Sequence, residues 1–93
     1  NLDLVNILIN AGTDINISDK YNNTALLYAS YANNIDLVNA LINAGADINI
    51  ALLNACYANK LDIVNALINA GSNVNVVDKC ENTPLIIACK QNN

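Results

Sequence analysis

Residues 34–50 read NIDLVNALINAGADINI, and this stretch decides the fold because the chain carries it three times. One near copy, NLDLVNILINAGTDINI, occupies residues 1–17, and another, KLDIVNALINAGSNVNV, occupies residues 60–76. Internal repetition with a period of 20–50 residues is typical of proteins built from stacked structural repeats. We therefore expect one elongated repeat domain rather than a globular fold around a single core.

A second segment recurs between the copies of the first. It reads DKYNNTALLYASYAN at 19–33 and DKCENTPLIIACKQN at 78–92, and its latter part returns as ALLNACYAN at 51–59. Gly12 and Gly45, at equivalent places in the first segment, are 33 residues apart. The complete unit therefore has a period of 33 residues.

The motifs within this unit carry a family resemblance. A 33-residue period with T-P-L-x-x-A is the ankyrin signature. The motif stands here as Thr-Pro-Leu at 83–85 with Ala88, and as Thr-Ala-Leu at 24–26 with Ala29. The family's G-A-D-x-N is intact at 45–49. The sequence thus resembles the ankyrin-repeat family over essentially its whole length. This resemblance implies an all-α repeat solenoid of stacked helix-turn-helix repeats with short β-hairpin-like turns.

The hydrophobic pattern agrees with that architecture. Ile35, Leu37, Val38, Leu41 and Ile42 form an apolar stripe at helical spacing. Each copy of this helix ends at a glycine, which favours the left-handed conformation at a helix C-terminus. We predict outer helices at 2–11, 35–44 and 61–70, and inner helices at 24–32, 51–58 and 83–91.

One unit is too short. Gly45 and Gly71 are only 26 residues apart, and the residues matching 18–24 are missing at the junction of Ile50 and Ala51. Either the natural protein has lost these residues, or the printed sequence omits them. We favour omission, because stacked ankyrin units use this hairpin to return the chain.

This shortfall sets the expected division of the chain. The single ankyrin-repeat domain, 1–93, consists of a partial repeat at 1–17, a full repeat at 18–50, a repeat lacking about seven hairpin residues at 51–77, and a partial repeat at 78–93. Because the first and last units are incomplete, we expect further repeats on both sides, or a partner chain over the ends.

Composition excludes several classes of function. The net charge is −4, and the basic residues are four lysines, without arginine. Nucleic-acid and anionic-membrane binding need clustered basic residues, so neither partner is expected. No apolar run approaches the roughly 18 residues of a membrane helix. Three cysteines without C-x-x-C spacing fit free thiols in a reducing compartment, so we expect an intracellular, cytoplasmic protein. Export as an effector stays an open alternative.

Catalysis has few candidate groups in this sequence. There is no histidine, so Ser–His and Cys–His pairs are excluded within the chain. The acids in the turns recur in every unit, which indicates local hydrogen bonds rather than a catalytic pair. We therefore predict no catalytic, cofactor-binding or metal-binding residue, no cofactor and no small-molecule substrate.

The cysteines and the helical asparagines are expected to be structural. Cys56 and Cys89 occupy the repeat position of Ser30, so we predict that both are buried and unpaired. Cys80 lies at a turn tip and is predicted to be exposed. Pairs of asparagines spaced i,i+4 fall on one face of each outer helix, and we expect a solvated convex surface there: Asn6 and Asn10, Asn39 and Asn43, Asn65 and Asn69.

The resemblance also implies where a partner binds. Ankyrin arrays usually bind proteins on the concave face formed by turn tips and inner helices. The residues at matching positions are Lys20, Tyr21, Asn23, Tyr31, Ala32, Tyr57, Ala58, Lys79, Cys80, Asn82, Lys90 and Gln91. We expect a protein-protein interaction scaffold, and the alternative is a targeting or spacer arm of a larger enzyme, channel or toxin.

Overall fold

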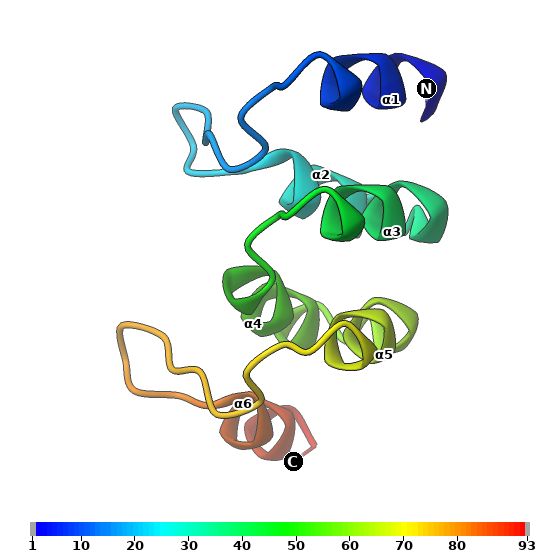
Figure 1. Cartoon of the computed structure of the whole chain (residues 1–93). Helices are drawn as coiled ribbons and strands as arrows, with labels where there is room; N and C mark the ends of the chain where they lie inside the picture. Colours follow the sequence, from blue (N-terminus) through cyan, green and yellow to red (C-terminus); the bar gives the residue numbers. More distant parts are fainter. Residues whose placement is uncertain (1, 93) are drawn as a thin grey trace.

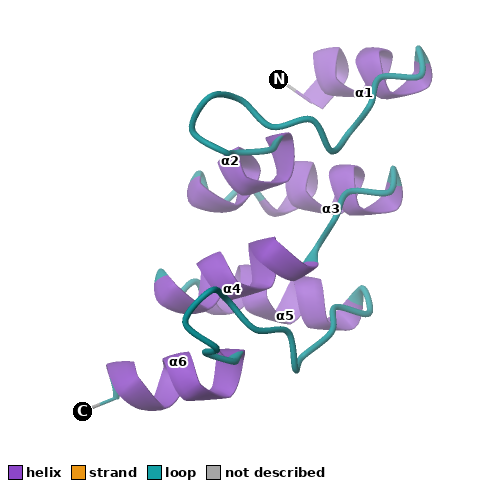
Figure 2. Cartoon of the chain, turned by 90° about the vertical axis from the view of Figure 1, so that its left-hand side faces the viewer, coloured by secondary structure: helices purple, strands orange, loops and turns teal. Residues whose placement is uncertain are grey.

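The computed structural model describes residues 2–92, and within them it contains helices and loops but no strand (Figures 1 and 2). The all-α prediction is confirmed, and every helix starts and ends within two residues of the predicted bounds. The helices are α1 (Leu2–Asn10), α2 (Ala25–Tyr31), α3 (Ile35–Asn43), α4 (Asn49–Tyr57), α5 (Leu61–Asn69) and α6 (Pro84–Gln91).

The helices form a stack of pairs that extends 44 × 24 × 21 Å (Figure 1). Helix α2 packs against α3, and α4 packs against α5, so each pair combines an inner and an outer helix. The inner helices also pack on one another in the order α2, α4, α6, and the outer helices in the order α1, α3, α5. Each unit therefore contacts only its neighbours, as in other solenoids.

Aliphatic side chains fill the space between the two rows of helices. Leu26 and Leu52 from the inner row, and Val38, Ile63 and Leu67 from the outer row, are completely buried. Burying such a side chain contributes about 1.5–3 kcal/mol relative to leaving it exposed. The repeated Leu, Ile and Val positions of the sequence are thus the positions that hold the stack together.

Two loops project from the same side of the stack, and we call them hairpin 18–24 and hairpin 77–83 (Figure 1). In each, the backbone amide of the aspartate donates to the asparagine carbonyl four residues later: Asp19 to Asn23 at 3.0 Å and Asp78 to Asn82 at 3.1 Å. Each hairpin leads into a threonine that caps the following helix, so the hairpin positions the start of an inner helix.

The middle unit has no such hairpin. Helix α4 begins at Asn49 and continues through Ile50 and Ala51, with the Leu52 amide bonded to the Ile48 carbonyl at 3.0 Å. Ile48 precedes the helix and offers no side-chain cap, unlike Thr24 at the start of α2. Helix α4 therefore starts two residues earlier than predicted. The omission of seven residues from the printed sequence stays a prediction.

The cysteines depart from one expectation. All three are free thiols, and Cys80 is exposed, as predicted. Cys56 is half-buried, but Cys89 is exposed, so the prediction of a buried Cys89 was wrong. Ser30, at the same position in α2, is buried, and α2 packs against the outer helix α3. Within residues 2–92, α6 has no outer helix following it, and this leaves the Cys89 side chain uncovered.

Candidate functional site

Asp78 is the centre of a connected group of polar side chains at hairpin 77–83. Its Oδ1 accepts hydrogen bonds from the amides of Cys80, at 2.8 Å, and Asn82, at 3.0 Å, and these bonds fix hairpin 77–83. Its Oδ2 accepts a hydrogen bond from the Tyr57 hydroxyl at 2.6 Å. One carboxylate therefore both shapes a turn and ties it to the end of α4 in the preceding unit.

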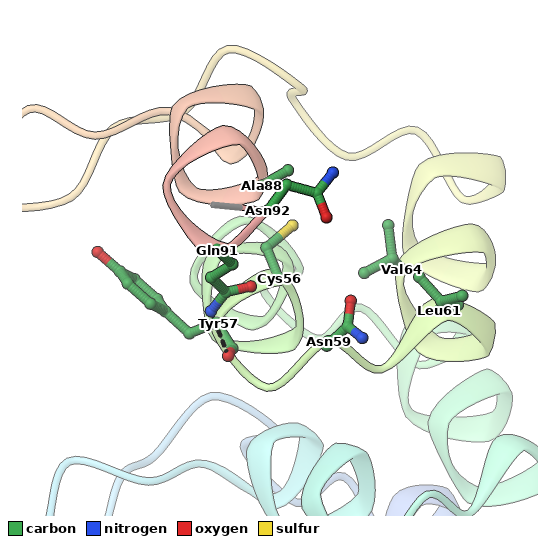
Figure 3. Close-up of a pocket in the computed structure, with 8 residues that line it drawn as sticks. All are labelled: Cys56, Tyr57, Asn59, Leu61, Val64, Ala88, Gln91 and Asn92. Carbon is green, nitrogen blue, oxygen red and sulfur yellow. Dashed lines mark hydrogen bonds between the residues drawn. The ribbon is translucent and has the colours of Figure 1, made fainter.

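Three further side chains complete this group, which we call the Tyr57 cluster (Tyr57, Asp78, Asn82, Lys90 and Gln91). Asn82 Nδ2 lies 3.4 Å from the Tyr57 hydroxyl, and Lys90 Nζ donates to Asn82 Oδ1 at 3.0 Å. Gln91 Nε2 donates to the Tyr57 carbonyl at 2.6 Å (Figure 3). The structure thus brings together four residues predicted for the binding face, and it adds Asp78.

A related arrangement surrounds Asp19 in hairpin 18–24. Asp19 Oδ1 accepts from the amides of Tyr21, at 2.9 Å, and Asn23, at 3.1 Å, and its Oδ2 accepts from the Tyr28 hydroxyl. Lys20 Nζ lies 5.1 Å from the centroid of the Tyr21 ring, within cation–π range. Here the tyrosine belongs to the same unit as the hairpin, whereas Tyr57 belongs to the unit before its hairpin.

Both tyrosine–aspartate pairs shift the acidity of their members. The hydrogen bond from Tyr57 lowers the pKa of Asp78, and the same bond raises the pKa of Tyr57. The bond from Tyr28 likewise lowers the pKa of Asp19 and raises that of Tyr28. Both carboxylates are therefore ionised at neutral pH, as acceptors of these bonds.

The side chains of the remaining predicted residues form no hydrogen bond to these clusters within residues 2–92. The side chains of Tyr31 and Tyr21 are 46% and 68% exposed, and Ala32 and Ala58 are exposed at the ends of the inner helices. Lys79 and Cys80 form the exposed tip of hairpin 77–83. The sequence predicted only turn hydrogen bonds for Asp19 and Asp78. Nothing in the repeat pattern indicated that a tyrosine hydroxyl donates a hydrogen bond to the second carboxylate oxygen of each.

The recurring turn residues do form the hydrogen bonds expected of them. Asp14, Asp47 and Asn73 each accept, through Oδ1, from the amide two residues later. Asn16 also reaches the next unit, where its Oδ1 accepts from the Asp47 amide at 2.7 Å and its Nδ2 donates to the Gly45 carbonyl at 3.3 Å. These polar groups hold the turns, and they stack one turn on the next.

A hollow of about 610 Å³ lies between α4, α5 and α6 (Figure 3). Apolar and amide side chains line most of it, and Cys56 is its only thiol. Burial raises the pKa of the Cys56 thiol, which disfavours the reactive thiolate. Across residues 2–92, no group of three or more His, Cys, Asp or Glu side chains could hold a metal ion. In the same range, no helix is long and apolar enough to cross a membrane.

Comparison with protein families agrees with the repeat architecture. Residues 1–51 match ankyrin repeats (3 copies), and residues 52–93 match ankyrin repeats (many copies). A search of curated proteins gives no match. Ankyrin repeats are generally modules for binding other proteins and are typically not catalytic. With both halves of the sequence matched and the helix pairs stacked as the family requires, the chain belongs to the ankyrin-repeat family.

Proposed function

We propose that the chain is a protein-interaction scaffold whose partner binds across the hairpin tips and the exposed side of the inner helices. The observation that carries this proposal is the exposure of tyrosines on that side: Tyr21 at 68%, Tyr31 at 46% and Tyr57 at 48%. Tyrosine offers a large contact area with a polar tip, and it is enriched among residues that dominate binding energy.

The surroundings of these tyrosines support a rigid recognition surface. The hydrogen bonds of Asp19 and Asp78 hold both hairpins, and the Tyr57 cluster fixes hairpin 77–83 against α4 and α6. A surface that is ordered before binding loses less conformational entropy when a partner arrives. The free thiols fit a reducing, intracellular setting. We assign the chain no catalytic step, because its turn acids already bind backbone amides.

The test uses the chain as bait to identify a partner, followed by measurement of affinity with variants. Tyr21→Ala and Tyr31→Ala are the informative changes, because neither hydroxyl is hydrogen-bonded within residues 2–92 and the fold should persist. Each should weaken binding by roughly tenfold or more if it is an anchor.

The matched control lies on the convex side. Asn39→Ala with Asn43→Ala changes two exposed residues of α3 and should leave the affinity unchanged. If these asparagine changes weaken binding and the tyrosine changes do not, the partner binds the convex face and the proposal is wrong.

A further inference from the structure

Hairpin 18–24 and hairpin 77–83 have the same framework but different tips. From the aspartate to the threonine they read DKYNNT and DKCENT, so they differ only in the two residues at the tip. The shared residues shape the turn, because the aspartate accepts from two backbone amides and the threonine caps the following helix. The residues that differ, Tyr21 and Asn22 against Cys80 and Glu81, are all exposed. The two hairpins therefore present different side chains on a similar backbone.

Glu81 has a backbone conformation that does not suit its residue type. Its φ is 64°, in the left-handed region, and Asn22 has a φ of 63° at the equivalent place. Asparagine tolerates this region because its short side chain can hydrogen-bond locally, whereas in most other L-residues Cβ crowds the following carbonyl oxygen. The turn holds Glu81 there, since its amide donates to the Asp78 carbonyl at 3.0 Å. Glutamate therefore makes this hairpin less stable than asparagine would.

No contact within the described residues offsets this strain. The Glu81 carboxylate forms no hydrogen bond or ion pair with any residue from 2 to 92. The neighbouring side chains of Asp78 and Asn82, in contrast, are both hydrogen-bonded within the Tyr57 cluster. Strained backbone positions occur preferentially at functional sites, where the side chain serves a purpose other than stability. A glutamate at this place is therefore better explained by recognition than by folding.

The charges near the tip favour a cationic ligand. The chain as a whole has a net charge of −4, which attracts basic proteins. In hairpin 77–83, the two acids Asp78 and Glu81 outweigh the single base Lys79. Asp78 already accepts hydrogen bonds from Tyr57 and from two backbone amides. Glu81 is thus the acid of this hairpin whose carboxylate is free to accept a charge-assisted hydrogen bond from a ligand.

We propose that Glu81 determines specificity at the tip of hairpin 77–83, and that its carboxylate binds an arginine or lysine side chain of a basic partner protein. The inference rests on the proposed function and names the chemistry of one contact within it. Hairpin 18–24 has Asn22 at the same place, so its tip recognises a different group of the partner.

Three substitutions separate the charge of Glu81 from its backbone strain. Glu81→Asn relieves the strain and should raise the midpoint temperature of thermal unfolding by about 2–6 °C. The reciprocal change, Asn22→Glu, introduces the same strain and should lower the midpoint by a similar amount. Glu81→Gln removes the charge alone and should leave the midpoint unchanged. A lower midpoint for Glu81→Asn would show that the fold itself requires glutamate there, and the inference would be wrong.

The binding probe is a phage-displayed library of random dodecapeptides, selected in parallel on the unchanged chain and on Glu81→Gln. Peptides from the unchanged chain should be enriched in arginine and lysine relative to peptides from the variant. A synthetic peptide from the first pool should bind Glu81→Gln about tenfold more weakly, the loss expected for one charge-assisted hydrogen bond. Added salt should weaken its binding to the unchanged chain more than its binding to the variant.

The control for the peptide is Asn39→Ala with Asn43→Ala on the convex face, which should bind it like the unchanged chain. Equal arginine and lysine content in the two pools, or no selected peptide at all, would overturn the inference. Peptides that lose affinity for Tyr21→Ala or Tyr31→Ala but not for Glu81→Gln would refute this contact and leave the proposed function intact. Peptides that lose affinity only for the asparagine variant would count against both.

Discussion

The hydroxyl of Tyr57 and the carboxylate of Asp78 lie 2.6 Å apart, and this bond joins the end of α4 to the hairpin that precedes α6. Tyr57→Phe removes only the donor oxygen, so the variant should unfold at a lower temperature than the unchanged chain. Tyr31→Phe is its matched control, since the equivalent hydroxyl has no bond within residues 2–92. Thermal unfolding followed by circular dichroism makes the comparison. Equal midpoints for the two variants would show that the bond does not stabilise the fold.

Asn16 links successive turns through two hydrogen bonds, and Asn75 offers a control at the same repeat position. The Asn75 side chain forms no bond to any residue in the described range, and both residues lie in the same kind of turn. Asn16→Ala should lower the free energy of unfolding by about 0.5–1.5 kcal/mol, whereas Asn75→Ala should have almost no effect. Urea unfolding of both variants measures the difference, and similar losses would refute a link between turns.

Acid should weaken both hairpins. The pKa values of Asp19 and Asp78 are lowered in the folded chain, so the unfolded chain binds protons more readily as the pH falls. Their contribution to stability is complete above the ordinary carboxyl pKa of about 3.9 and is lost as the pH falls through the lower folded values. Between pH 5 and about pH 2, the free energy of unfolding of the Asp78→Asn variant should therefore fall less than that of the unchanged chain. The midpoint of urea unfolding is measured for both proteins over that pH range. If the two midpoints fall equally with pH, the prediction is wrong.

The three thiols should differ in reactivity. Cys80 and Cys89 are exposed, whereas Cys56 is half-buried and its pKa is raised by burial. Alkylation by iodoacetamide at neutral pH, quantified by peptide mass spectrometry, should therefore label Cys56 last. In urea all three should react alike, because unfolding removes the difference in burial. Early labelling of Cys56 in the native chain would show that its partial burial between α4, α5 and α6 does not protect the thiol.

Restoring a hairpin should stabilise the chain. Insertion of SDKYNNT between Ile50 and Ala51 supplies an aspartate at the repeat position of Asp78 and a threonine at the start of the inner helix, where Ile48 now provides no cap. The cap alone is worth about 0.5–2 kcal/mol. The control is an insertion of seven glycine and serine residues, which has the same length but no aspartate or threonine. It should not raise the midpoint temperature of thermal unfolding. If both insertions destabilise the chain equally, the shortened connection is native.

The helices could be predicted because each carries its own local signals. The apolar spacing of Val38 and Leu41, and the caps at Thr24 and Thr83, act within one or two helical turns. The exposure of Cys89 could not be predicted, because it depends on whether another helix covers α6. Helix α4 starts early for a similar reason, since no threonine-capped hairpin precedes it.

The polar contacts of the candidate site could not be predicted from the sequence. Tyr28 and Asp19 are nine residues apart, and Tyr57 and Asp78 are 21 apart, although the sequence around each aspartate is similar. The two bonds therefore use different tyrosines of the repeat. Asp78 has Ile87 in its own unit where Asp19 has Tyr28, so Asp78 pairs with a tyrosine of the preceding unit. The repeat pattern aligns these positions but does not give the distance between a hydroxyl and a carboxylate in neighbouring units.

In the middle unit the chain enters α4 without a projecting loop, and Leu52 is still completely buried. The length of the loop before an inner helix is thus independent of the burial of that helix in the stack. A change in chain length at Ile50 therefore alters the side from which the hairpins project, while Leu52 keeps its place in the core. Arrays of this kind can acquire a new specificity through changes in loop length, before any point mutation is selected.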